Sequence, residues 1–148
     1  MSAYQHILVA LDTSEQAPQV LEKAHKLAQQ NSATLSVLHV IEPMADAANY
    51  AFDGTIAVNL LPLQNTLEEA TRENIKKLVN PFAIPEQHQY ILIGQAASQI
   101  HDFSEQHGCD LIVIGSHGRH GLALLLGSTA NAVLHGAKCD VLAVRFKD

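Results

Sequence analysis

Cys109-Asp-Leu-Ile-Val-Ile-Gly-Ser-His-Gly118 gives the strongest indication of how this chain folds. Its apolar run ends at a glycine and consists of branched aliphatic side chains, as is typical of a strand buried on both faces of a parallel sheet. A near copy, Cys139-Asp-Val-Leu-Ala-Val144, lies close to the C-terminus. We therefore predict two neighbouring parallel strands, at residues 110–114 and 140–144.

Strands and helices alternate through the rest of the chain. Apolar runs rich in branched residues predict further strands at residues 6–11, 34–41 and 87–93. Apolar residues spaced three and four apart predict helices at residues 17–28 and 96–107. Opposite charges four residues apart predict a helix at residues 66–80, and a short helix is predicted at residues 128–135, before Gly136. Thr13 or Ser14 is expected to cap the first helix and Ser128 the last. This alternation predicts one α/β domain over residues 1–148, a doubly wound five-stranded parallel sheet with helices on both faces.

Residues 42–64 do not fit the alternation. They contain Pro43, Gly54 and Pro62, and their three charged residues are all acidic. A structureless connection of this length is unusual inside a compact domain. We expect a partly ordered segment that covers a ligand or widens an interface.

Composition excludes several classes of protein. The 148 residues carry a formal net charge of −6, which argues against nucleic acid as a partner because such binding needs clustered positive charge. No apolar run approaches the ~18 residues of a membrane span, and no targeting segment is recognisable. Cys109 and Cys139 do not form a disulfide framework, so we expect reduced thiols and a cytoplasmic protein.

A glycine-rich loop follows the strand at residues 110–114. Gly115, Gly118 and Gly121 recur every third residue, and Gly127-Ser128-Thr129 then opens the last predicted helix. Between Asp110 and Asp140 there is no carboxylate, whereas Arg119 adds a positive charge. Backbone N–H groups at such a turn can hold a phosphate, although an ordinary strand-to-helix turn has the same composition. The spacing is neither a Walker A loop nor G-x-G-x-x-G.

Asp12 follows the first strand. In a doubly wound sheet, ligands bind beyond the carboxyl ends of the strands where the strand order reverses. Asp12 is therefore a candidate contact for a base, a ribose or a metal ion, and the alternative is that it caps the first helix. The nine histidines are dispersed and form no zinc-binding pattern, so no metal ligand is predicted.

The combination of His6-Ile-Leu-Val-Ala-Leu-Asp-Thr-Ser14, Leu38-His-Val-Ile41, Gly94 with Ile100, and the stretch from Asp110 to Gly127-Ser128 resembles the universal stress protein family. The resemblance implies strand order 3-2-1-4-5 and a cytoplasmic homodimer that pairs through the strand from Asp140 to Val144. It also implies ATP or another adenine nucleotide as ligand, with or without Mg²⁺. By position, Asp12 and the backbone of Val40 would hold adenine and ribose, and the ribose and phosphates would be held by Gly115, Gly118, Gly127, Ser128 and Thr129.

One departure from the family pattern bears on function. The nucleotide-binding pattern is G-x2-G-x9-G-[ST], but eight residues separate Gly118 from Gly127 here. Two hypotheses stay open: a small nucleotide-binding regulatory module of the stress response, and a dimeric stress-response interaction protein that binds no nucleotide. We expect no enzyme, because no nucleophile has a recognisable base beside it; slow ATP hydrolysis is the residual alternative. The sequence does not indicate the downstream protein partner.

Overall fold

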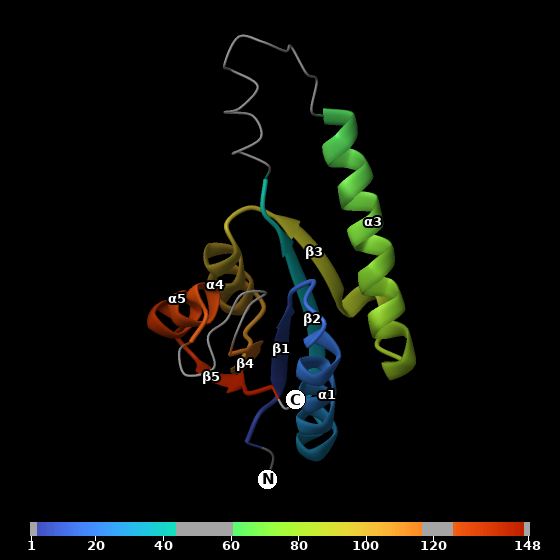
Figure 1. Cartoon of the computed structure of the whole chain (residues 1–148). Helices are drawn as coiled ribbons and strands as arrows, with labels where there is room; N and C mark the ends of the chain where they lie inside the picture. Colours follow the sequence, from blue (N-terminus) through green and yellow to red (C-terminus); the bar gives the residue numbers. More distant parts are fainter. Residues whose placement is uncertain (1–2, 44–60, 117–125, 147–148) are drawn as a thin grey trace.

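Five parallel strands form the centre of the computed structural model, which describes residues 3–43, 61–116 and 126–146. The strands are β1 (His6–Leu11), β2 (Thr34–Ile41), β3 (Gln89–Ile93), β4 (Leu111–Gly115) and β5 (Asp140–Val144). Their order in the sheet is β3-β2-β1-β4-β5, so β3 and β5 are the edge strands (Figure 1). The predicted fold class and strand order are confirmed.

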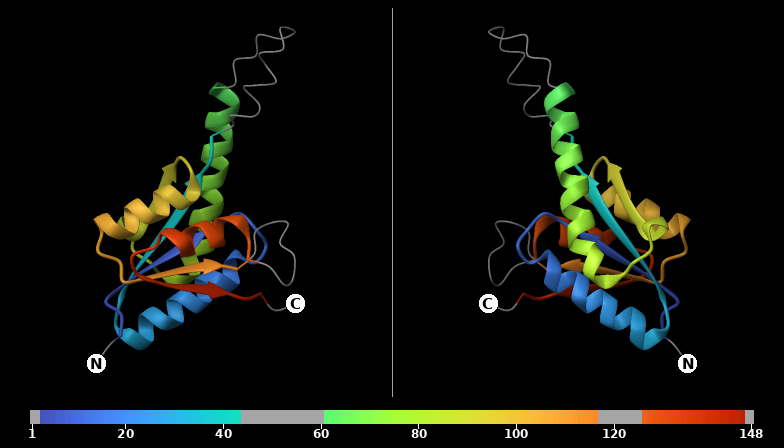
Figure 2. Two further views of the ribbon diagram at one scale, coloured as in Figure 1. Left: turned by 90° about the vertical axis from the view of Figure 1, so that its left-hand side faces the viewer. Right: turned by 90° about the vertical axis from the view of Figure 1, so that its right-hand side faces the viewer.

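Four helices cover the two faces of this sheet (Figure 2). Helices α1 (Ala17–Asn31) and α3 (Leu61–Val79) pack on one face against Ile7, Val9 and other odd-numbered strand residues. Helices α4 (Ala96–Gln106) and α5 (Ser128–Gly136) pack on the opposite face against Leu8, Ile112 and their neighbours. Because side chains alternate between the two faces along a strand, the largely apolar strands supply both cores.

The register places the glycine loop beside the end of β1. Ala10 of β1 pairs with Ile114 of β4, and Leu11 pairs with His39 of β2. The chain moves from β1 through α1 to β2 on one side, whereas β4 lies on the other side of β1. The strand order therefore reverses between β1 and β4, which is where open α/β sheets bind ligands.

The predicted helix caps are wrong. Helix α1 has Gln16 at its N-cap position with no side-chain hydrogen bond, and Pro18 lies in its first turn. Proline pre-sets the helical φ there, where its missing N–H has no intrahelical role. Ser14 does not cap α1, because its N–H and Oγ both donate to Asp12 Oδ1. In α5, Gly127 is the N-cap and Ser128 is already the first helical residue.

Helix α3 begins earlier than predicted from the charge pairs of residues 66–80. It starts at Leu61, inside the segment expected to be irregular, and after Val79 it continues as a 3-10 turn over Asn80–Phe82. Ile75 and Val79 are buried, whereas Leu67 is 47% exposed, and the N-terminal half of α3 projects beyond the sheet (Figure 1). A second 3-10 turn, Glu86–His88, precedes β3. The rest of the segment, residues 44–60, lies outside the described residues.

None of the helices in the described ranges combines the length and apolarity that a membrane span needs.

Candidate functional site

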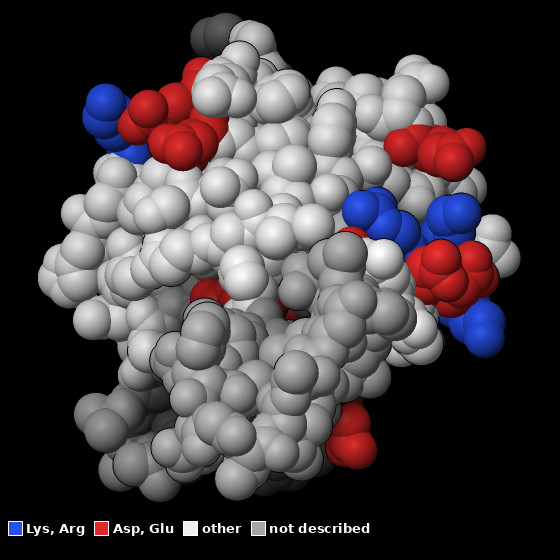
Figure 3. All heavy atoms as spheres, turned by 90° about the horizontal axis from the view of Figure 1, so that it is seen from above, with Lys and Arg blue, Asp and Glu red and all other residues white. Residues whose placement is uncertain are grey.

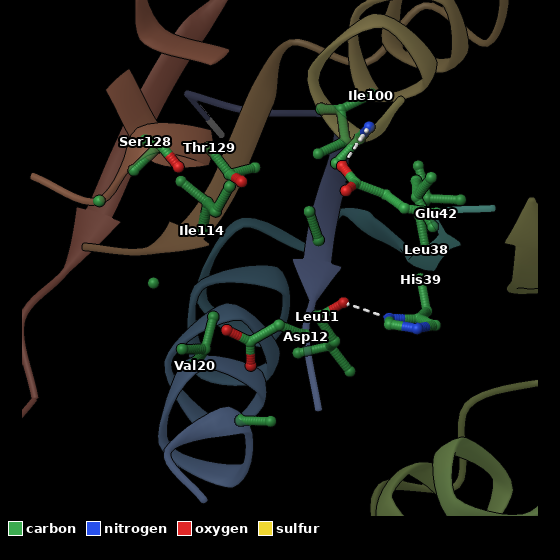
Figure 4. Close-up of a pocket in the computed structure, with 17 residues that line it drawn as sticks. Leu11, Asp12, Val20, Leu38, His39, Glu42, Ile100, Ile114, Ser128 and Thr129 are labelled. Atoms are coloured by element: carbon green, nitrogen blue, oxygen red, sulfur yellow. Dashed lines mark hydrogen bonds between the residues drawn. The ribbon is translucent and has the colours of Figure 1, made fainter. Parts of the chain in front are cut away.

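A pocket of about 250 Å³ opens at the carboxyl ends of β1, β2 and β4 (Figure 4). It lies where the strand order reverses, so the position expected for a ligand is hollow. Its lining comes from three strands and three helices: Ala10, Leu11, Asp12, Ala17, Val20, Leu38, His39, Val40, Glu42, Ala96, Ile100, Ile114, Gly115, Gly127, Ser128, Thr129 and Ala130.

The two ends of the pocket differ in chemistry. Leu38 and Ile100 form an apolar end between β2 and α4, whereas Ser128 and Thr129 lie across the pocket at the start of α5 (Figure 4). An α-helix leaves its first N–H groups without intrahelical acceptors, and Gly127 supplies no capping side chain. The start of α5 therefore presents amides and hydroxyls to the pocket, with the positive end of the helix dipole behind them.

Asp12 contributes a carboxylate whose orientation is set by a local turn. Its Oδ1 accepts from the Ser14 N–H at 2.9 Å and from Ser14 Oγ at 2.6 Å. Asp12 is exposed and lines the pocket beside Val20. Its role is therefore a turn before α1 and not the cap of that helix, and within the described part of the chain Oδ2 is left for a ligand.

The backbone of Val40 is open on the side of the pocket. The Gly94 N–H donates to the Ile41 carbonyl at 3.0 Å, so Ile41 uses its backbone groups toward β3. Adjacent residues of a strand direct these groups to opposite sides, and Val40 therefore directs its carbonyl toward the β1 side, where β1 has already ended at Leu11. Val40 lines the pocket, and its backbone contact with a ligand stays a prediction.

His39 is a packed histidine, as its position within an apolar strand predicts. Its ring is 8% exposed, and Nδ1 lies 2.7 Å from the Leu11 carbonyl. A carbonyl only accepts, so Nδ1 carries the proton and donates. The hydrogen bond ties the end of β2 to the end of β1 at the rim of the pocket (Figure 4).

Gly115 has a structural role in addition to lining the pocket. A Cβ built at this glycine would lie 2.7 Å from Phe146 Cζ and 3.3 Å from Val20 Cγ2. The space that a side chain would need is therefore filled by Phe146, which packs against the α1 side of the core. Among the described glycines, positive φ occurs at Gly94 and Gly108, not at Gly115.

The two described ends of the glycine loop are fastened to the sheet. The Gly127 N–H donates to the Ser116 carbonyl at 2.7 Å, and the Ser116 N–H donates to the Val144 carbonyl at 2.9 Å. These bonds hold the start of α5 beside β4. Gly118 and Arg119 lie outside the described residues, so the effect of the shortened spacing stays a prediction.

Glu42 is a pocket residue that the sequence reasoning missed. It follows β2, and its Oε1 accepts the Ala96 N–H at 3.3 Å at the start of α4. An acidic residue directly after a buried strand was the available signal, since it is the same signal that singled out Asp12. Figure 3, which faces this end of the sheet, shows Asp or Glu atoms inside a hollow.

The described lining of the pocket holds two carboxylates, Asp12 and Glu42, and no Lys or Arg. In the same described ranges, no three His, Cys, Asp or Glu side chains gather closely enough to bind a metal ion. Among the described lining residues, the positive potential at a bound anion therefore comes from the start of α5.

Both cysteines are free thiols away from this pocket. Cys109 is buried, and burial raises the pKa of its thiol to about 12. Burial and the neighbouring Asp140 carboxylate raise the pKa of Cys139 as well. Thiolates are the reactive form of cysteine, so both groups are held in their unreactive state.

His101 and His107 make specific contacts away from the pocket. His101 Nε2 lies 2.9 Å from the Val133 carbonyl, which links α4 to α5. The His107 ring stacks on Phe103 with 3.8 Å between ring centroids. The sequence of α4 does not show that α5 lies next to His101, or that the His107 ring stacks on Phe103.

Fold and pocket together define a doubly wound α/β domain with a ligand crevice at its switch point. The universal stress protein family model matches residues 3–145, and the chain belongs to this family. It is 42% identical over 145 residues to universal stress protein A homolog 1 of Coxiella burnetii, a match covering 98% of this chain and 99% of the relative. It is 31% identical to the universal stress protein A homolog of Haemophilus influenzae, over 98% and 99% of the two chains.

Solved structures show the same architecture. UspA from Lactobacillus plantarum superposes with a TM-score of 0.76 at 26% identity, over 98% of this chain and all of that one. The hypothetical protein MJ0577, a test case for assigning biochemical function from structure, superposes with a TM-score of 0.74 at 28% identity, over 98% of both chains. A universal stress protein solved in complex with cAMP superposes with a TM-score of 0.62 at 23% identity, over 97% of this chain and 98% of that one. This likeness shows the shared fold.

Proposed function

We propose that this protein is a small cytoplasmic regulatory module of the stress response that binds ATP or another adenine nucleotide in the switch-point pocket. The observation that carries the proposal is the meeting of Asp12, Val40, Gly115, Gly127, Ser128 and Thr129 around one cavity. Six of the eight residues proposed from the sequence line it together, although they come from four separate segments of the chain.

The chemistry of the cavity fits a nucleotide from end to end. The apolar slot at Leu38 and Ile100 suits a flat heterocyclic ring, because ligand pockets bury apolar groups against aliphatic walls. The open amides of α5 suit phosphate oxygens. Asp12 lies between these ends and offers a carboxylate oxygen either to ribose hydroxyls or to Mg²⁺, which prefers oxygen ligands and phosphates.

Binding without catalysis is the second part of the proposal. His39, the histidine of the pocket, uses Nδ1 to hold the Leu11 carbonyl. The hydroxyl of Ser14 donates to Asp12 inside a turn. Neither arrangement is an activated nucleophile with a base aligned by a third group, so we assign regulation and not turnover to this site.

The test measures binding directly. Mass spectrometry of the small molecules released on denaturing the purified protein should detect an adenine nucleotide. ATP at a hundred times its Kd should stabilise the fold by about 2.7 kcal/mol. Asp12→Ala should weaken this stabilisation, and Asp102→Ala, which removes an exposed carboxylate of α4 away from the pocket lining, should not. The proposal fails if no nucleotide co-purifies and neither ATP nor ATP with Mg²⁺ shifts the melting temperature.

We also propose a homodimer that pairs through β5. This strand lies at one edge of the sheet, where unpaired backbone groups are a template for adding another strand. If the protein binds no nucleotide, this edge favours the alternative function of a dimeric interaction protein. Sedimentation at micromolar concentration should give twice the mass of the chain, and a monomer throughout would contradict the pairing.

A further inference from the structure

Glu42 closes the apolar end of the pocket. It follows β2 directly, and its side chain extends from there toward Ile100 and α4 (Figure 4). Ser128 and Thr129 lie on the opposite side of the cavity. A nucleotide whose phosphates meet α5 would therefore bring the edge of its heterocyclic ring to Glu42.

The carboxylate of Glu42 is held in place by α4. Oε1 accepts the Ala96 N–H at 3.3 Å, in the first turn of the helix. Gln95 supplies the other cap of the same turn, with its Oε1 accepting the Ser98 N–H at 2.8 Å. Because one oxygen of Glu42 is used by the backbone, the second oxygen is an oriented acceptor that a ligand can meet.

The neighbouring polar group has the same hydrogen-bonding character. The Val40 carbonyl is directed to the side on which β1 has ended. A carbonyl and a carboxylate both accept and neither donates. This end of the pocket therefore favours a ring edge that carries hydrogen-bond donors. A ring oxygen placed there would face two other acceptors, the Val40 carbonyl and the Glu42 carboxylate.

We propose that Glu42 determines base specificity by accepting a hydrogen bond from the exocyclic amino group at position 6, so that a 6-aminopurine is bound in preference to a 6-oxopurine. This inference rests on the proposed nucleotide function. In adenine the group at position 6 is an amine, which donates. In hypoxanthine it is a carbonyl oxygen and the donor of that ring edge moves to N1–H, so the group that meets the Glu42 carboxylate at position 6 is a second acceptor. Glu42 is exposed in the structure without a ligand, so the selectivity depends on the bound ring covering the second carboxylate oxygen and excluding water from it.

The size of the preference follows from hydrogen bonds to charged groups. Losing one, with the acceptor left unpaired, weakens binding by about tenfold to a hundredfold. Glu42→Gln keeps an oxygen for the Ala96 N–H, but the amide can rotate and donate to a 6-oxo group. The substitution should therefore remove most of the preference without removing the contact to α4.

The experiment compares ATP with ITP, which differ at this position of the ring. Isothermal titration of the full chain should give a Kd for ITP at least tenfold higher than for ATP, and Glu42→Gln should reduce that ratio to about threefold or less. Gln95→Ala is the matched control, because it weakens the same turn of α4 from a position outside the pocket lining. It should lower the melting temperature while leaving the ratio unchanged.

The outcomes separate the two levels of the proposal. If ATP and ITP bind equally well, or if Glu42→Gln preserves the wild-type ratio, Glu42 does not read the base while nucleotide binding stands. If Gln95→Ala changes the ratio as much as Glu42→Gln, the effect belongs to the α4 turn and the inference is wrong. If neither nucleotide binds, the proposed function and the role of Glu42 fail together.

Discussion

Replacing Gly115 with Ala adds one methyl group at the junction of β4, the pocket and the C-terminal segment. The new Cβ would lie 2.7 Å from Phe146 Cζ and 3.3 Å from Val20 Cγ2. The first separation is too short for carbon atoms, so either the Phe146 ring leaves its position or β4 shifts. Because φ at Gly115 is not in the positive region, the cost comes from packing and not from backbone strain.

The magnitude is bounded by the two ways of relieving the contact. If the half-buried ring swings out, the protein loses about half the benefit of burying a phenylalanine, or about 1 kcal/mol. If the ring stays and the backbone yields, overpacking costs up to about 3 kcal/mol. At about 3 °C per kcal/mol for a domain of this length, the melting temperature should fall by about 3–9 °C.

A double-mutant cycle tests the cause of this loss. Phe146→Leu removes the ring atom that approaches Gly115, so Gly115→Ala should cost at least about 1 kcal/mol less in that background. Thermal or urea unfolding of the four proteins without ligand gives the coupling free energy. Equal costs of Gly115→Ala in both backgrounds would refute the packing explanation and leave ligand approach as the reason for the glycine.

Two further predictions follow from burial. Cys109, with its pKa raised from 9.0 to about 12, should react with iodoacetamide about a thousandfold more slowly in the native protein than in the urea-unfolded chain; equal rates by mass spectrometry would contradict this. Since the unfolded thiol ionises first, stability should also decrease between pH 9 and 12. Ile75 is 4% exposed, so Ile75→Ala should lower the free energy of unfolding by about 2–5 kcal/mol. Leu67 is 47% exposed, so Leu67→Ala should change the free energy of unfolding by no more than about 0.5 kcal/mol.

The strands were predictable because each is a short, continuous run of branched apolar residues. Residues 6–11, 34–41 and 140–144 were placed with the bounds that the structure has. The cap of α1 was not predictable, because the Asp12 carboxylate competes with the helix for Ser14. A hydroxyl before a helix is usually a cap, but here the Asp12 carboxylate takes both the Ser14 hydroxyl and its N–H.

The candidate site was predictable where topology alone assembles it. Asp12 and Gly115 end neighbouring strands, so their meeting follows from strand order. Glu42 was missed because its position in the pocket depends on a hydrogen bond from Ala96 in the first turn of α4, which lies 54 residues later in the chain. Phe146 was missed for the same reason: an aromatic residue after the last strand carries no local signal that it fills the space beside a glycine.

The sheet divides the interior of this protein into two cores that do not share side chains. One belongs to α1 and α3, and the other to α4 and α5. The pocket at the end of the sheet is bordered by both, through Val20 from the first and Ile100 from the second. A molecule bound there rests on two independently packed halves at once. A single ligand would therefore connect the two cores through Val20 and Ile100, at the end of the sheet where both border the same cavity.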